Sequence, residues 1–180
     1  MNLKPLTTLI GPVAVTFAML PALISADEVE PAKSGAATVI AFGACAHENR
    51  PQPIWEAIVA AGPDLFIFAG DNIYADTNDM DVMKAKYAKL AGQPGYRKLL
   101  KTCPVLATWD DHDFGVNDGG KNYPQKKESA KICLDFFGVP KNDLRRTREG
   151  IYGSQIMGEK GRRVQVILLD TRYFRDDLDK

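Results

Sequence analysis

The sequence is poor in histidine and cysteine, and it has no excess of charge of either sign. It contains two histidines and three cysteines, and 23 basic residues balance 23 acidic ones, so the formal net charge is zero. Basic tracts interleaved with aromatic residues do not occur, so the composition predicts no specific nucleic-acid-binding surface. Cys45, Cys103 and Cys133 lie in no spacing typical of a zinc site, which excludes the common Cys/His zinc motifs.

The chain also lacks a long uninterrupted apolar run. A membrane-spanning helix needs roughly 20 apolar residues, whereas the stretch from Leu9 to Ile24 is broken by glycine, threonine and proline. Lys4 precedes this stretch and small residues follow it, in the order of a secretory signal. We therefore predict a signal peptide over residues 1–26 and an exported protein, periplasmic or extracellular, with no stable membrane span after cleavage. An uncleaved signal that anchors the protein to the membrane is the alternative.

The rest of the chain has the composition of one globular domain. The 180 residues are 45% hydrophobic and 26% charged, which is ordinary for a folded chain of this length. Residues 27–36 contain proline, alanine and glycine and are predicted to form a linker. The folded part is then expected to extend from residue 37 to residue 180. The sequence assigns no oligomeric state.

Short apolar runs alternate with amphipathic stretches along this part, which is the pattern of an α/β fold with a mainly parallel sheet flanked by helices. The run "DLFIFAG", for example, is short and continuously apolar, as buried parallel strands are. We predict strands over residues 37–45, 64–70, 104–109, 150–158 and 162–170, and helices over residues 53–62, 79–92, 96–101 and 125–138.

Polar side chains follow three of the predicted strands directly. Cys45 ends the first strand, Asp71 follows the second, and the loop after the third carries Asp111 and Asp113. Ligands of open α/β sheets bind beyond the carboxyl ends of the strands, so these side chains should face one another. Converging acids repel unless a cation or protons compensate them, and carboxylates suit hard cations such as calcium, magnesium or manganese. The alternative is that these acids are solvated loop residues.

Four segments occur in an order that resembles a known family. They are "FGACA", "GDNIYAD", "WDDHDFGVNDGG" and "LLDTRYFR", and they extend over residues 37–175. Together they resemble the alkaline phosphatase D (PhoD-like) family of calcineurin-like metallophosphoesterases. The resemblance implies part of an αββα sandwich, and hydrolysis of phosphate esters, mono- or diesters, by a metal-bound hydroxide.

The resemblance also implies roles for individual residues. Asp71 corresponds to the acid that bridges two metal ions, and Asp111 occupies a further ligand position. Cys45 and Tyr74 match the thiolate and phenolate that mark this family, and they point to Fe3+ beside Ca2+. His112 matches the neighbouring histidine position, where it could stabilise developing charge or protonate the leaving group.

Three further expectations complete this interpretation. Asn117 lies in the same motif and is predicted to orient the phosphate of the substrate, while Asp170 and Arg172 are predicted to form a structural ion pair. Further ligands of the family lie beyond the "LLDTRYFR" segment, so the chain is expected to be an N-terminal portion of the catalytic domain, incomplete at its C-terminus. The alternative function is a truncated non-catalytic α/β fragment that retains partial metal or phosphate binding. The sequence leaves open whether Cys103 and Cys133 form a disulfide.

Overall fold

The structure is a computed structural model that describes residues 39–178. The predicted signal peptide, residues 1–26, and linker, residues 27–36, lie outside this range. Among the residues described, no helix has both the length and the apolar character that crossing a membrane would require.

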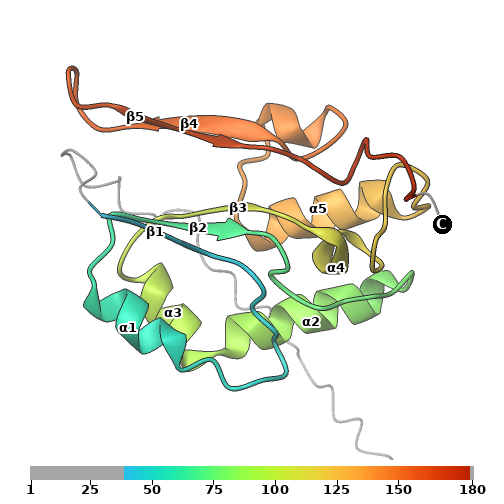
Figure 1. Ribbon diagram of the computed structural model, residues 1–180, viewed down its shortest axis with the longest axis horizontal. Coiled ribbons are helices and arrows are strands. Elements are labelled where there is room, and N and C mark those ends of the chain that lie inside the picture. The colour runs from blue at the N-terminus through green and yellow to red at the C-terminus, as the bar shows by residue number, and fades with distance from the viewer. Residues whose placement is uncertain (1–38, 179–180) are drawn as a thin grey trace, which may run out of the picture. The chain divides into compact units, whose positions relative to one another are not determined.

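The centre of the described unit is a parallel sheet of three strands (Figure 1). These are β1 (Ile40–Gly43), β2 (Leu65–Ala69) and β3 (Val105–Thr108), in the order β1-β2-β3. The register pairs Ile40 with Leu65 and Phe66 with Val105. The predicted parallel α/β arrangement is confirmed, and the carboxyl ends of all three strands meet at one edge of the sheet.

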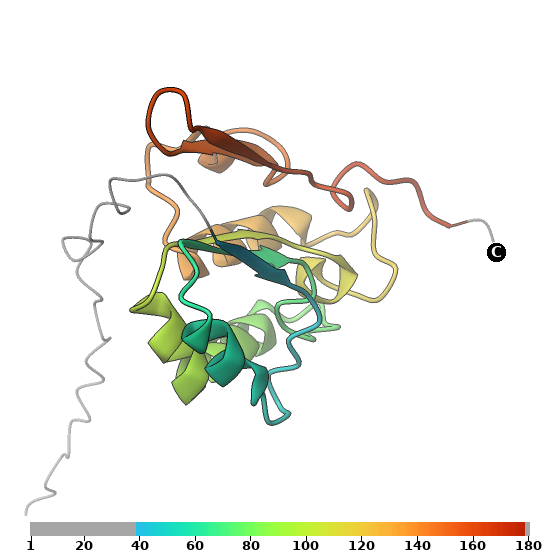
Figure 2. The same cartoon turned by 60° about the vertical axis from the view of Figure 1, so that its left-hand side comes forward.

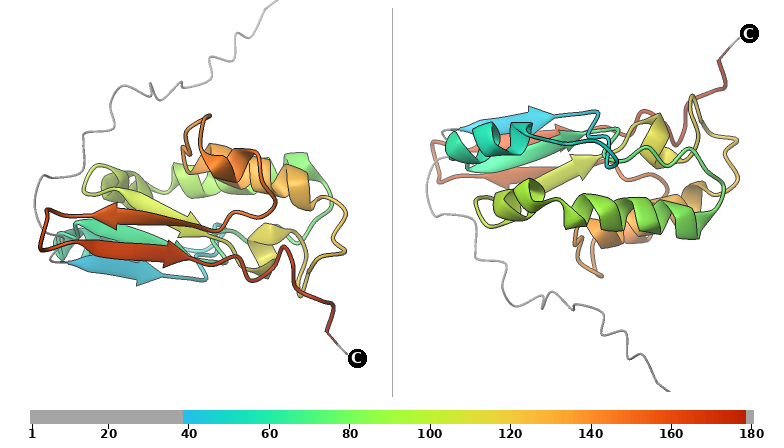
Figure 3. Two further views of the ribbon diagram at one scale, coloured as in Figure 1. Left: turned by 90° about the horizontal axis from the view of Figure 1, so that it is seen from above. Right: turned by 90° about the horizontal axis from the view of Figure 1, so that it is seen from below.

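A layer of three helices covers one face of this sheet (Figure 3), and a fourth helix packs against that layer. The Asp79 carboxylate begins α2 by accepting from the backbone N–H groups of its first turn. Proline in the first turn of α3 suits that position, because its missing N–H would have no partner there. The four helices are α1 (Ile54–Ala60), α2 (Met80–Gly92), α3 (Pro94–Leu100) and α5 (Lys126–Phe136).

The side chains of β2 alternate between two cores. Phe66 and Phe68 are buried on the helical side, where both lie edge-on to Trp55. Leu65 points to the other face and packs against Val166 and Leu168. These belong to an antiparallel hairpin of β4 (Gly153–Met157) and β5 (Val164–Leu168), which lies across the sheet from the helices (Figure 2).

One sequence-based expectation differs from the structure, and one open question is answered. The polar stretch after β3 is not simply a loop: its first residues form a short helix, α4 (Asp111–Phe114), before which the Asp110 N–H donates to the Asp113 carboxylate. Cys103 and Cys133 are buried thiols and not a disulfide. The chain also forms a short 3-10 turn, η2 (Leu144–Arg146), which begins at an Asp143 side-chain cap.

Candidate metal centre

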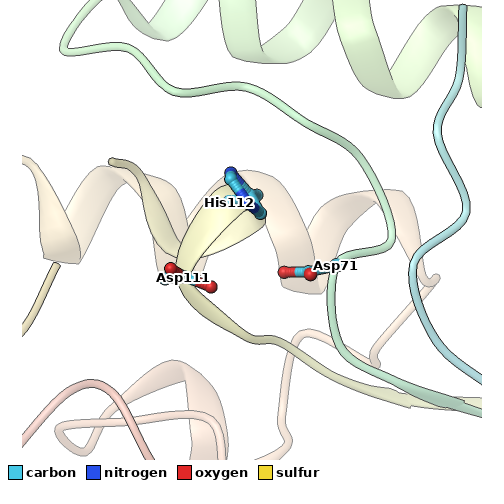
Figure 4. Close-up of side chains that lie close together, drawn as sticks. All are labelled: Asp71, Asp111 and His112. Carbon is cyan, nitrogen blue, oxygen red and sulfur yellow. The ribbon is translucent and has the colours of Figure 1, made fainter. Parts of the chain in front are cut away.

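Two aspartates and a histidine meet at the carboxyl edge of the parallel sheet (Figure 4). Asp71 comes from the loop after β2, and Asp111 and His112 come from α4 after β3. One ligand atom of each residue lies within 4.8 Å of the others. The convergence expected from the strand order is therefore present, and it creates a cluster with the donors of a cation site.

Asp71 is held in place by an unusual backbone. Gly70 and Asp71 have φ angles of 115° and 50°. A Cβ on Gly70 would lie 2.6 Å from the Cβ of Asp110, so only glycine lets the two loops approach this closely. This turn directs the Asp71 carboxylate toward α4.

One oxygen of Asp71 is left without a hydrogen bond. Asp71 is 8% exposed, and its Oδ1 accepts no hydrogen bond from the described residues. Burial raises the pKa of this carboxyl, against the opposing effect of His112, and the nearby Asp110 and Asp111 raise it further. A buried carboxylate oxygen with no donor is costly unless a cation or a proton meets it. This orphaned oxygen is the observation that fits a bound metal.

Asp113 has a different role from the one its place in the sequence indicated. It is fully buried, and each of its oxygens accepts hydrogen bonds. Oδ1 accepts from the N–H groups of Asp71 at 3.2 Å and Asp110 at 2.8 Å, and Oδ2 accepts from the backbone of Asn72 at 3.1 Å. Burial raises the pKa of Asp113 to about 8, while these donors oppose the shift. Asp113 thus ties the two loops together, and the structure does not support it as a ligand.

Asp111 is held at both oxygens, in contrast to Asp71. Its Oδ2 accepts from the Asp118 N–H at 2.7 Å, and its Oδ1 lies 3.4 Å from the Arg172 guanidinium. Burial alone would raise the pKa of Asp111, but the Asp118 N–H and the charge of Arg172 outweigh it and lower the pKa. Asp111 is therefore an ionised donor with a defined orientation.

The predicted ion pair between Asp170 and Arg172 is wrong. Arg172 pairs with Asp110 instead. Asp170 accepts from the indole N–H of Trp109 at 2.9 Å and from the backbone N–H of Ile151 at 2.8 Å. Both contacts connect segments that lie far apart in the sequence, so the spacing within "LLDTRYFR" could not reveal them.

Cys45 and Tyr74 lie at the same edge of the sheet. The Cys45 thiol donates to Asp71 Oδ2 at 3.5 Å, and its N–H donates to the Gly70 carbonyl at 3.2 Å. The Tyr74 ring contacts both histidines of the chain, with centroids 4.7 Å from His47 and 4.3 Å from His112. Burial raises the pKa of Tyr74, and the neighbouring Cys45 and Asp71 add to the effect. A phenolate at this position would need a cation to stabilise it.

His112 is oriented by a carboxylate that its sequence motif did not indicate. Its Nδ1 lies 2.7 Å from Asp76 Oδ1, so a proton on Nδ1 leaves Nε2 as the second donor or acceptor. Burial would lower the pKa of His112, but the hydrogen bond and charge of Asp76, with Asp71 and Asp111 nearby, raise it overall. His112 is therefore prepared to carry a proton.

Glu48 is a second residue that the sequence pattern did not reveal. It is 3% exposed, accepts from the Tyr74 N–H at 2.9 Å and pairs with Lys86 at 2.7 Å. A buried glutamate directly after a histidine has no sequence signal of its own, because its partners lie on other elements.

Asn117, by contrast, is exposed, and its amide donates to Asp118 at 2.9 Å. This hydrogen bond does not bring Asn117 to the cluster.

Strained backbone is concentrated around this site. Among the described residues, four other than glycine have positive φ angles, and each lies in a loop that carries or supports the cluster. Such conformations persist only where the surrounding structure enforces them, and they gather at functional sites. The four are Cys45 (59°), Asp71 (50°), Asp76 (46°) and Asp118 (59°).

Comparisons with known proteins agree with this arrangement at the level of the fold. No protein-family model and no curated protein sequence matches the chain. A solved structure described as "Structure of PhoD" matches 82% of this chain, with a TM-score of 0.59 and 17% sequence identity. The match covers 34% of that chain, so this protein spans about a third of the PhoD structure. The described unit is thus an α/β fold that resembles part of PhoD.

The donors that converge here fit a hard or borderline cation. Asp71 and Asp111 offer carboxylate oxygens and His112 offers an imidazole nitrogen, and the Cys45 thiol lies 3.5 Å from Asp71 Oδ2. Carboxylates suit calcium and magnesium, and thiolate extends the range toward iron. Calcium takes about six to eight ligands, so the cluster could fill only part of its coordination sphere.

Proposed function

We propose that this chain contributes the metal-binding half of a phosphoesterase site. In this proposal Cys45, Asp71, Tyr74 and Asp111 hold two or more metal ions, with Fe3+ and Ca2+ as the best fit to the donor set. Bound ions would neutralise phosphate charge and lower the pKa of a coordinated water, as metal ions do in phosphatases. The substrate is a phosphate ester, either a monoester or a diester.

The chain's own residues then have distinct tasks. Asp71 would hold the ions through its carboxylate, since its Oδ1 is buried and free of donors. His112, paired with Asp76, can give a proton to the leaving oxygen or stabilise charge on it. Asn117 is proposed to contact the phosphate only if its exposed loop bends inward, since its amide now binds Asp118.

The observation that carries the proposal is the orphaned Asp71 oxygen within a cluster of donors at the carboxyl edge of a parallel sheet. The PhoD-like fold adds support of a different kind, because the matched part of PhoD has a similar fold, with a TM-score of 0.59. An αββα sandwich, in which the hairpin belongs to the second sheet and a second helical layer covers that sheet, belongs to this proposal. So does export by the N-terminal signal peptide.

The test measures metal binding and hydrolysis separately. The full chain, loaded with Fe3+ and Ca2+, is assayed on bis(p-nitrophenyl) phosphate and p-nitrophenyl phosphate with and without a chelator. Asp71→Asn is the matched variant. Iron bound through Tyr74 should give a visible charge-transfer colour that Tyr74→Phe removes. Chelator-insensitive hydrolysis, or metal uptake that Asp71→Asn leaves unchanged, would contradict the proposal.

A second candidate function is cation or phosphate binding without turnover. The cluster of Asp71, Asp111 and His112, which would fill only part of a coordination sphere, favours it. In that case the chain takes up metal in an Asp71-dependent manner but releases no nitrophenol. The two measurements above therefore separate an enzyme from a binding module.

A further inference from the structure

We infer that Arg172 is a positioning residue for Asp111, and that it sets the affinity of the proposed metal centre by fixing the orientation of that carboxylate. The inference rests on the proposed function and adds to it a residue outside the donor set. Arg172 lies 61 positions beyond Asp111 in the chain, in the segment that follows β5.

The segment after β5 is fastened to the start of the α4 region. The Thr108 hydroxyl donates to the Leu169 carbonyl at 2.7 Å, and the Trp109 indole donates to Asp170 at 2.9 Å. Asp170 Oδ1 also accepts from the N–H groups of Arg172 at 3.1 Å and Tyr173 at 2.9 Å, which forms a tight turn. The turn aims the Arg172 side chain at α4.

Arg172 spans two neighbouring carboxylates. Its Nε donates to Asp110 Oδ1, and its Nη2 lies 3.4 Å from Asp111 Oδ1. The side chains of Arg172 and Asp111 are 15% and 11% exposed, so solvent screens the pair less than it would at the surface. The planar guanidinium can hold both acids at once, which the point charge of a lysine cannot do as well.

The Asp111 carboxylate is consequently fixed from two sides. Oδ1 meets Arg172, and Oδ2 accepts from the Asp118 N–H at 2.7 Å. Each carboxylate oxygen has two lone pairs, so both atoms keep the capacity to bind a cation. Groups that orient a metal-binding carboxylate in this way contribute strongly, and their loss typically costs about 10–100-fold in metal affinity.

Orientation and charge predict opposite effects of removing Arg172. If the guanidinium acted only through its charge, its removal would strengthen cation binding, because like charges repel. If it orients Asp111, its removal should weaken binding by about 10-fold or more. The sign of the change therefore decides the inference.

Arg175 provides a matched control in the same segment. Its guanidinium donates to the backbone carbonyls of Asp118 and Gly119, on the same loop, and neither of these hydrogen bonds reaches the Asp111 carboxylate. Arg175→Met should thus loosen the loop that carries the Asp118 N–H but leave the contacts of Arg172 with Asp110 and Asp111 in place. Any general effect of a weakened segment appears equally in both variants.

The experiment titrates the full chain with Tb3+, which prefers oxygen ligands and is sensitised by nearby aromatic rings. Arg172→Met should weaken Asp71-dependent Tb3+ binding about 10-fold or more. Arg172→Lys should restore part of the loss, and Arg175→Met should change the binding little. Emission lifetimes in H2O and D2O count the waters on the ion. They should show about one more water in Arg172→Met, because water fills the position that Asp111 vacates.

The outcomes are separable. Binding that depends on Asp71 but is unchanged or tighter in Arg172→Met overturns the inference alone. Wild-type binding that does not depend on Asp71 overturns the metal centre and the inference with it. Should Arg172→Met fail to fold, Arg172→Lys keeps the positive charge but loses the planar guanidinium. It should still bind Tb3+ more weakly than the wild type, and unchanged binding there also overturns the inference.

Discussion

The loops after β2 and β3 each present one aspartate to the same point, but they hold it in different ways. Asp71 stands on a strained turn, with a φ of 50° and an oxygen that has no hydrogen-bond partner among the described residues. Asp111 stands in the first turn of a helix, with a hydrogen-bond donor on Oδ2 and an ion pair with Arg172 at Oδ1. The Asp71 carboxylate keeps one oxygen free to bind a cation, at a cost in stability, and the Asp111 carboxylate is held in one orientation. A site that must bind a cation needs both properties.

The largest effects should come from neutralising each aspartate in turn. Asp71→Asn and Asp111→Asn should both reduce metal binding, Asp71→Asn to background. In the metal-free protein their effects on stability should have opposite signs. Asp71→Asn should raise the free energy of unfolding by about 1 kcal/mol, because it removes a buried charge whose Oδ1 has no donor. Asp111→Asn should lower it by about 2 kcal/mol, because charged hydrogen bonds are lost.

The pH dependence of stability sharpens this comparison. The pKa of Asp71 is raised on folding, so its penalty is absent at low pH and grows as the pH rises from its ordinary value of 3.8 through the raised pKa. The pKa of Asp111 is lowered, so its contribution is present above the ordinary value and is lost as the pH falls through the lowered pKa. Chemical denaturation of the two variants between about pH 3 and pH 7, at about half-unit steps, measures both. Equal signs for the two variants would refute the distinction between the loops.

The close approach of the two loops depends on Gly70. Alanine there would place a methyl group 2.6 Å from the Asp110 Cβ and 2.8 Å from the Asp110 nitrogen, at a φ of 115°. We expect Gly70→Ala to destabilise the protein by roughly 4 kcal/mol, from overpacking and backbone strain together. Gly62 is the control, since it also has a positive φ, 58°, but a methyl group there would meet no atom within 4 Å.

Gly62→Ala should cost only about 1 kcal/mol, because strain alone acts there. Denaturant titrations of the two variants give the difference. Equal losses would mean that the loops separate easily, and the Asp71 and Asp111 positions would then be independent of each other.

Sequence patterns predict one part of this molecule well and another part poorly. The strands are predictable because each is a local apolar run, as in Leu65–Ala69, and the convergence of Asp71 and Asp111 follows from their places after parallel strands. The supports of these residues are not predictable in this way. Arg172 meets Asp110 across 62 positions, and no local periodicity encodes such a pair. The α4 helix was missed because its four residues are too few to show a helical period.

The hairpin tests how far the Asp111 loop depends on distant packing. Leu168 is 7% exposed and packs with Leu65 against the sheet, directly before the segment that carries Arg172. Leu168→Ala should lower the free energy of unfolding by about 2 kcal/mol. It should also weaken cation binding, because the Arg172 segment loses its anchor.

Ile167 is the matched control for this change. It is the preceding residue of the same strand, but it is 63% exposed. Ile167→Ala should change stability by less than about 0.5 kcal/mol. Thermal melts with and without Tb3+ compare the two. A Leu168→Ala variant that is less stable but binds Tb3+ normally would show that the Asp111 loop keeps its conformation without the packing of the hairpin.

The smallest effect concerns the contact that joins the two loops, between Asp76 after β2 and His112 in α4. Because Asp76 raises the pKa of His112 above its ordinary 6.5, the pair contributes stability below that value. This stability is lost as the pH rises through the raised pKa. Asp76→Asn should lower the pKa of His112, because the hydrogen bond and the charge of Asp76 are lost, and it should flatten the fall in stability above neutral pH. Imidazole proton NMR resolves the titration, because the chain has two histidines and His47→Gln identifies the other signal. An unchanged His112 titration in Asp76→Asn would mean that the Asp76 carboxylate does not raise the pKa of His112.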